Sequence, residues 1–238
     1  MTTSRTVLAV AAHADDETLG AGGTLAEHAA AGDRVRILVL SASSTSRPGV
    51  DDDPGHRAAC VHRAAALYGA EAEIAGFDDN AFDTVPRLQI TQTVEAAIRR
   101  WRPSIVYTHS SADLSLDHRI TGEAVAAATR PQPGHPVATV LAWEVRSATE
   151  WGPGRPFRPA WFQPLAPTAL AVKEQALAVY ASEMRPWPHT RSTQAALAAA
   201  RLRGAQIGVQ AAEAFEVIRH TVTMPAGTTP APHLPGRA

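Results

Sequence analysis

Residues 6–17 read TVLAVAAHADDE, and this stretch decides the fold class. Residues 6–12 form a continuous apolar run, which predicts a strand buried on both faces. The polar residues after it lead into 16–32, where apolar side chains recur at helical spacing until Gly32. A buried strand that passes through a short polar turn into a helix is typical of an α/β protein.

The same alternation of strand and helix continues to residue 144. Strands are expected at 34–41, 73–77, 104–108 and 137–144, and helices at 57–68, 87–101 and 120–129. Further on, an irregular loop is expected at 151–164, helices at 168–180 and 192–204, and a strand at 215–222. The alternation predicts a Rossmann-like, mostly parallel sheet with helices on both faces.

Length and composition favour one globular domain. With 238 residues, 45% of them hydrophobic and 19% charged, we expect a single α/β domain over 1–223 and a Pro-rich, flexible tail over 224–238. A net charge of −1 argues against a nucleic-acid partner. The absence of long apolar stretches and of a signal-peptide core predicts a cytoplasmic protein without membrane insertion. The single Cys60 excludes an intramolecular disulfide, and a homo-oligomer stays open.

Polar clusters follow several of the expected strands. His13–Asp16 follows the first strand, 78–83 the third, and 109–118 the fourth. In open parallel sheets, ligands bind beyond the carboxyl ends of the strands. We therefore expect these clusters at one edge of the sheet.

Two of these clusters could together hold a metal ion. His13 and Asp16 can reach one cation from a strand-to-helix turn, and Asp15 beside them could act as a base. A mixed nitrogen and oxygen set suits zinc. The same carboxylates are equally typical of a helix N-terminus, where they satisfy free amides. Adding His118 from the same edge gives three protein ligands and leaves one position open, as a catalytic zinc requires.

Residues 12–17 resemble the His-Pro-Asp-Asp-Glu signature of the LmbE-like (PIG-L) zinc deacetylases, with Ala14 in place of proline. Further similar segments are Gly22–Leu25, Gly32–Val35, Asp79–Asp83, Asp113–Arg119, Arg203–Gly204 and Glu213–Phe215, so the resemblance covers about residues 5–220. It implies removal of the N-acetyl group from a GlcNAc-like amino sugar or its conjugate. One Zn²⁺ would be held by His13, Asp16 and His118, with Asp15 as general base.

The chain departs from the family at one position. Many members carry a histidine three residues before the last ligand, where it helps to hold the oxyanion, and this chain has Ser115. The branch of antibiotic-pathway sugar deacetylases also lacks that histidine, which favours a role in natural-product biosynthesis. His109, at the end of the same strand, is the candidate catalytic replacement, or else a structural histidine.

Substrate contacts are expected from Arg57, Asp79, Asp83 and His189. Each has a plain alternative as a helix charge, a turn cap or a loop residue. Two other functions stay open: an amidase that acts on a larger acyl or thiol-sugar conjugate, and a catalytically silent sugar-binding domain. The intact Asp15 argues against the silent domain, and the lack of a G-x-G-x-x-G turn argues against dinucleotide binding.

Overall fold

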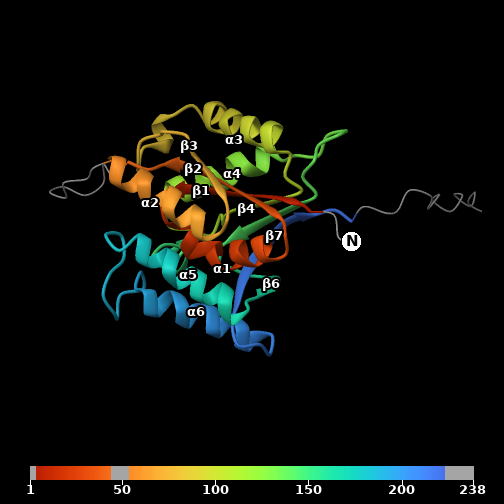
Figure 1. The fold of residues 1–238 in the computed structure, drawn as a ribbon. Coiled ribbons are helices and arrows are strands. Elements are labelled where there is room, and N and C mark those ends of the chain that lie inside the picture. The colour runs from red at the N-terminus through yellow and green to blue at the C-terminus, as the bar shows by residue number, and fades with distance from the viewer. Residues whose placement is uncertain (1–3, 44–53, 223–238) are drawn as a thin grey trace, which may run out of the picture.

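The computed structural model describes residues 4–43 and 54–222, so the predicted tail at 224–238 and most of the 43–55 loop lie outside it. A seven-stranded sheet with the order β3-β2-β1-β4-β5-β7-β6 forms the centre of this described part (Figure 1). The strands are β1 (Thr6–His13), β2 (Arg34–Ser41), β3 (Glu71–Ile74), β4 (Ile105–His109), β5 (Thr139–Trp143), β6 (Trp161–Pro164) and β7 (Ala212–His220). The helices are α1 (Asp16–Ala30), α2 (Pro54–Leu67), α3 (Arg87–Trp101), α4 (Leu116–Ala128), α5 (Pro167–Val179) and α6 (Thr193–Gln206).

The pairing of the strands confirms the predicted fold class. β1 is parallel to both β2 and β4, and β3 and β5 extend the sheet in the same direction on either side. Only β7 runs antiparallel, between β5 and β6, among the described strands. The fold is a mostly parallel α/β sheet.

Alternate side chains of β1 enter two separate cores, as expected for a strand buried on both faces. Val7, Ala9 and Ala11 belong to the core beneath α1, α2, α5 and α6. Leu8 and Val10 belong to the core beneath α3 and α4. The two helical layers lie on opposite sides of the sheet in Figure 1.

The strand order reverses direction between β1 and β4. The chain continues from β1 to β2 on one side and returns to β4 on the other, so the helices after β1 and β4 lie on opposite faces. Ligands bind at such switch points in open α/β sheets. His13 ends β1 and His109 ends β4, which places both at this switch point.

Several predicted boundaries were wrong. Helix α2 begins at Pro54 and β7 at Ala212, each three residues earlier than expected. Helix α4 begins at Leu116 instead of residue 120, because the Ser115 hydroxyl accepts the His118 amide as an N-cap and starts the helix within a polar segment. β3 covers Glu71–Ile74 instead of 73–77. β6 was expected as part of a loop, but its proline is tolerated because β6 is an edge strand.

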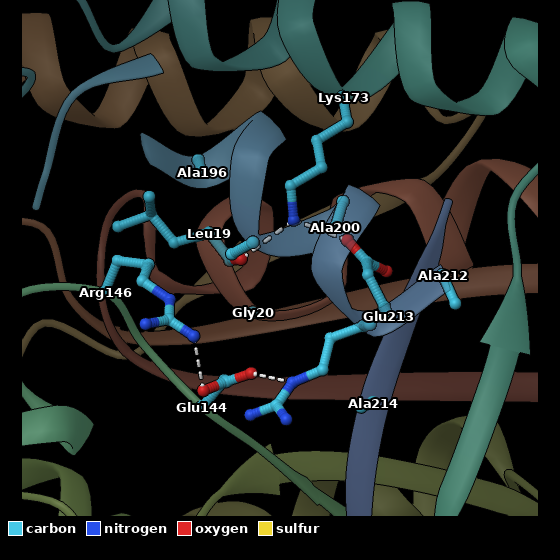
Figure 2. A pocket seen from close by; sticks show the side chains of 12 residues that line it. Leu19, Gly20, Glu144, Arg146, Lys173, Ala196, Ala200, Ala212, Glu213 and Ala214 are labelled. Carbon is cyan, nitrogen blue, oxygen red and sulfur yellow. Dashed lines mark hydrogen bonds and ion pairs between the residues drawn. The ribbon is translucent and has the colours of Figure 1, made fainter. Parts of the chain in front are cut away.

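A buried lysine joins three elements on the α1 side of the sheet (Figure 2). Lys173 Nζ on α5 donates to the Leu19 carbonyl on α1, at 2.8 Å, and to Glu213 on β7. Glu213 also accepts the α1 amides of Gly23 and Thr24, at 3.0 and 2.7 Å. We call Lys173, Glu213 and these three backbone groups the lysine cluster. It fastens the last strand to the first helix.

No helix in the described ranges is long and apolar enough to cross a membrane.

Candidate metal centre and active site

Three side chains meet at the carboxyl ends of β1 and β4. His13 Nδ1 lies 3.2 Å from His118 Nε2, and the Asp16 Oδ2 atom lies 3.3 Å from the first and 3.2 Å from the second. His13 ends β1, Asp16 begins α1, and His118 lies in the first turn of α4. The structure therefore brings together the three predicted ligands.

The spacing of these three atoms fits a metal ion. Two ligands that each lie about 2.0 Å from a tetrahedral zinc are separated by about 3.3 Å. The second carboxylate oxygen, Asp16 Oδ1, is buried and has no hydrogen-bond partner within the described chain. An orphaned carboxylate oxygen beside two imidazoles fits a metal site better than it fits a plain helix cap.

Carboxylates outside the three ligands orient the imidazoles. Asp113 Oδ1 lies 3.1 Å from His118 Nδ1, and Asp117 Oδ2 lies 3.0 Å from His13 Nε2. The other oxygen of Asp117 accepts the Phe82 amide at 3.2 Å. Such partners fix the ring orientation and tautomer of a metal-binding histidine. Asp117 thus serves both as an imidazole partner and as a partner of a loop amide.

The carboxylates also favour the protonated imidazoles. Burial lowers the pKa of His13, but the hydrogen bonds to Asp117 and Asp16 outweigh it and raise the pKa to about 9. Burial likewise lowers the pKa of His118, and Asp16 and Asp113 raise it to about 10. The site is therefore built for a positive charge, which protons or a metal ion can supply.

Asp15 lies beside the three ligands in a strained conformation. It is fully buried, and its φ of 95° is in the left-handed region, which is uncommon for a residue other than glycine. Arg191 Nη2 donates to both of its carboxylate oxygens, at 2.8 and 2.6 Å. Burial raises the pKa of Asp15 to about 6 against the opposing effect of Arg191. Near neutral pH, Asp15 is thus a carboxylate that can take up a proton.

His109 lies behind the ligands instead of facing an open space. Its ring stacks on His118 with centroids 4.1 Å apart, and its Nε2 accepts the Ala12 amide at 2.9 Å. The Trp143 indole nitrogen lies 3.3 Å from the Nδ1 atom, and the indole packs against Gly20, where no Cβ would fit. A neutral imidazole has one acceptor nitrogen, so the ring accepts only one of these two N–H groups at a time. Burial and the neighbouring His118 lower the pKa of His109 to about 3. This enclosed, neutral ring supports the structural alternative over the oxyanion role.

Two of the expected substrate residues lie next to the site. Asp79 Oδ1 lies 3.1 Å from His13 Nε2. Arg57 is buried, pairs with Glu183 at 2.7 Å, and donates to the Ser43 carbonyl at 2.6 Å. The Asp79 amide donates to the Ser43 hydroxyl, so these residues form one wall that begins at the end of β2.

The other two expected substrate residues are Asp83 and His189, and His189 lines a pocket. Asp83 is exposed on the short helix Phe82–Thr84, and no contact joins it to the ligands within the described ranges. His189 is exposed and lines an open pocket of about 470 Å³ with Ser147, Trp151, Arg185 and Arg191. Arg191 connects this pocket to Asp15.

Neither Arg191 nor the partner role of Asp113 was predicted from the sequence. Arg191 comes from a loop before α6, 176 residues after Asp15, and no spacing rule relates the two. A lone arginine in a Pro-rich loop carries no signal for an active site. Asp113 was within a quoted motif, but its partner became visible only once α4 was placed.

The fold and site define an α/β protein in which two histidines and one carboxylate at the strand ends could hold a metal ion. The chain belongs to the PIG-L family: residues 8–129, more than half of the chain, match the family described as GlcNAc-PI de-N-acetylase. This result confirms the resemblance seen in residues 12–17 and 113–119. The chain is a member of a deacetylase superfamily.

Solved structures share the fold over almost the whole chain. The conserved protein TT1542 from Thermus thermophilus is 27% identical, with 94% of this chain and 100% of that chain covered and a TM-score of 0.73. The A40926 pseudoaglycone deacetylase Dbv21 is 21% identical (92% and 99% covered, TM-score 0.72). GalB, a 4-carboxy-2-hydroxymuconate hydratase from Pseudomonas putida, is 21% identical (92% and 98% covered, TM-score 0.71). No curated protein matches the chain.

Proposed function

We propose that this protein is a zinc-dependent hydrolase that removes the N-acetyl group from a GlcNAc-like amino sugar or its conjugate in natural-product biosynthesis. The observation that carries the proposal is the trio His13, Asp16 and His118, spaced at 3.2 to 3.3 Å, with the Asp15 carboxylate beside it. Family membership and the antibiotic-pathway neighbour Dbv21 support an acetylated sugar as substrate.

The three ligands would hold one zinc ion, which supplies a Lewis acid and lowers the pKa of water toward about 7. Asp15 would take the proton from the attacking water on a carboxylate oxygen and later pass it to the leaving amine. Asp113 and Asp117 would keep the imidazoles of His118 and His13 oriented throughout.

The walls of the site support a polar substrate with a bulky extension. Arg57 and Asp79 would bind sugar hydroxyls on one side. His189 and Trp151 line the open pocket on the other side, where a conjugate could lie. Asp83 is exposed and makes no contact with the three metal-ligand residues of the described chain, so it would contact only a substrate that extends beyond the site.

The test is acetate release by the zinc-loaded protein from N-acetylglucosamine and its glycosides. Asp15→Asn is expected to lower kcat by about 10²- to 10⁴-fold while zinc stays bound, because it removes the base and no ligand. Glu123→Gln on the exposed side of α4 is the control and should retain full activity. Full turnover by Asp15→Asn with zinc bound would disprove the mechanism.

An amidase that acts on larger acyl groups is the second candidate, favoured by the size and openness of the pocket beside Arg191. A series of N-acyl glucosamines distinguishes the two: a deacetylase loses activity as the acyl chain lengthens, and the amidase gains it. A silent sugar-binding domain would bind the sugars without turnover. The GalB likeness makes hydration of a carbon–carbon double bond a further assay for the same preparation. Cytoplasmic location and oligomeric state stay predictions.

A further inference from the structure

We propose that Arg191 is the positioning residue of this active site: its guanidinium holds the Asp15 carboxylate in the orientation from which Asp15 accepts a proton. The inference rests on the proposed function, in which Asp15 is the base. It assigns a role to a residue outside the matched range 8–129.

The geometry joins two strained positions through one side chain. Arg191 Nη2 contacts both oxygens of Asp15, and Nη1 donates to the Ser147 hydroxyl at 3.2 Å. Asp15 and Ser147 both have positive φ values, 95° and 75°. Strained backbone persists only where the surroundings hold it, and it concentrates at functional sites. Here the two strained residues face the same guanidinium.

Arg191 is itself held in place by its loop. Its amide donates to His189 Nδ1 at 3.0 Å, and its carbonyl accepts the Arg185 amide at 3.1 Å. The next residue, Ser192, is the N-cap of α6 and accepts the Ala195 amide. The loop before α6 therefore fixes the backbone from which the guanidinium reaches Asp15.

The ion pair satisfies the Asp15 carboxylate but leaves one nitrogen of Arg191 without a partner among the described residues. Arg191 Nε is buried and has no partner in the part of the chain that the structure describes. A buried donor without a partner is costly, and a purely structural ion pair gains nothing from it. Each carboxylate oxygen can accept more than one hydrogen bond, so Asp15 can still contact a water on the metal side. Arg191 also gives the site a permanent positive charge.

The closing experiment compares Arg191→Ala, Arg191→Lys and a matched control, Arg203→Ala. Arg203 pairs with Glu144 at 2.8 Å, and its side chain is 15% exposed against 18% for Arg191, but it lies outside the site. In zinc-loaded protein, we expect Arg191→Ala to lower kcat about 10²-fold with KM changed less than about threefold, because misplaced reacting groups cost about that much. Arg203→Ala should keep kcat.

Added guanidinium ion provides a readout that a merely structural role would not move. It should raise the kcat of Arg191→Ala at least about tenfold and leave the kcat of Arg203→Ala unchanged. Only the space left by the Arg191 side chain lies beside Asp15. Arg191→Lys keeps the charge but loses the planar fork, so its kcat should lie between the two. If Arg191→Ala does not fold, the lysine variant and its KM-against-kcat split carry the test.

Unchanged kcat in Arg191→Ala, or a loss in KM alone, would overturn the inference. If the wild-type protein releases no acetate from any N-acetyl sugar, the proposed function fails instead. Crystal structures of the wild type and Arg191→Ala then test the positioning role of Arg191 independently of activity. The inference requires the Asp15 carboxylate to rotate or lose order in the variant, and an unmoved carboxylate would contradict it.

Discussion

Two buried charged groups contact helix α1, and they differ in how completely their charged side chains are paired. In the lysine cluster, Glu213 accepts two α1 amides and Lys173, and Lys173 also donates to the Leu19 carbonyl (Figure 2). At the N-terminus of the same helix, Asp16 Oδ1 and Arg191 Nε have no partner within the described chain. The charged groups of the lysine cluster satisfy one another. The unpaired atoms of the second group need a partner that the described part of the chain does not supply.

The difference distinguishes a structural charge network from a functional one. Buried polar atoms in proteins are nearly always paired, and exceptions call for a ligand or a mechanism. The strained backbone of Asp15 belongs to the second group, whereas every residue of the lysine cluster lies in the described ranges and has a negative φ. Changes to the first group should therefore affect stability, and changes to the second should affect metal binding and turnover.

The largest expected effect is on stability. Lys173→Met leaves Glu213 as an uncompensated buried charge and should lower the free energy of unfolding by about 3 to 5 kcal/mol. Urea denaturation measures the loss. Zinc affinity of the folded fraction should stay unchanged, and a weakened zinc affinity would contradict the division between the two groups. Arg87→Met, at an exposed ion pair with Glu123, should change stability by less than about 1 kcal/mol.

The second prediction concerns pH and metal affinity. The raised pKa values of His13 and His118, about 9 and 10, mean that protons occupy the metal-free site at neutral pH. Metal binding must release between one and two protons, because His13 Nδ1 and His118 Nε2 lie 3.2 Å apart and the two rings repel each other when both are charged. Zinc affinity should rise about 10- to 100-fold per pH unit between about pH 6 and 8. Calorimetry in buffers of different ionisation enthalpy counts the protons, and no release would refute the ligand assignment.

The third prediction tests the carboxylate behind His118. Asp113→Asn keeps the shape but weakens the hold on His118 Nδ1, so zinc affinity should fall about 10- to 100-fold. Asp33→Asn is the control, because Asp33 lies 2.8 Å from His28 Nδ1 at a place away from the site, while Asp113 lies 3.1 Å from His118 Nδ1. Competition with a zinc chelator measures both variants. Equal losses would mean that Asp113 acts through stability alone.

The smallest expected effect belongs to the open pocket. Trp151 is 63% exposed, so Trp151→Ala should change stability by less than about 0.5 kcal/mol. KM for a bulky aromatic glycoside should rise a few-fold through lost ring contact, with KM for N-acetylglucosamine itself unchanged. Equal increases for both substrates would show that the pocket does not select the conjugate.

The sequence was enough to predict the sheet and the three candidate ligands. Apolar runs such as 6–12 mark buried strands, and the rule for parallel sheets brings residues after β1 and β4 to one edge. Spacing could not reveal the Asp15–Arg191 contact, because it depends on how a late loop packs. The orientation of His109 was equally hidden, since it follows from Trp143 packing against Gly20.

The residues of the candidate site fall into two segments of the chain. Every candidate metal ligand among the described residues lies between residues 13 and 118, inside the segment that matches the family. Arg191, Trp151 and His189 lie beyond it. Substitutions in the second segment can therefore alter the entrance and the setting of Asp15 while every candidate metal ligand stays unchanged.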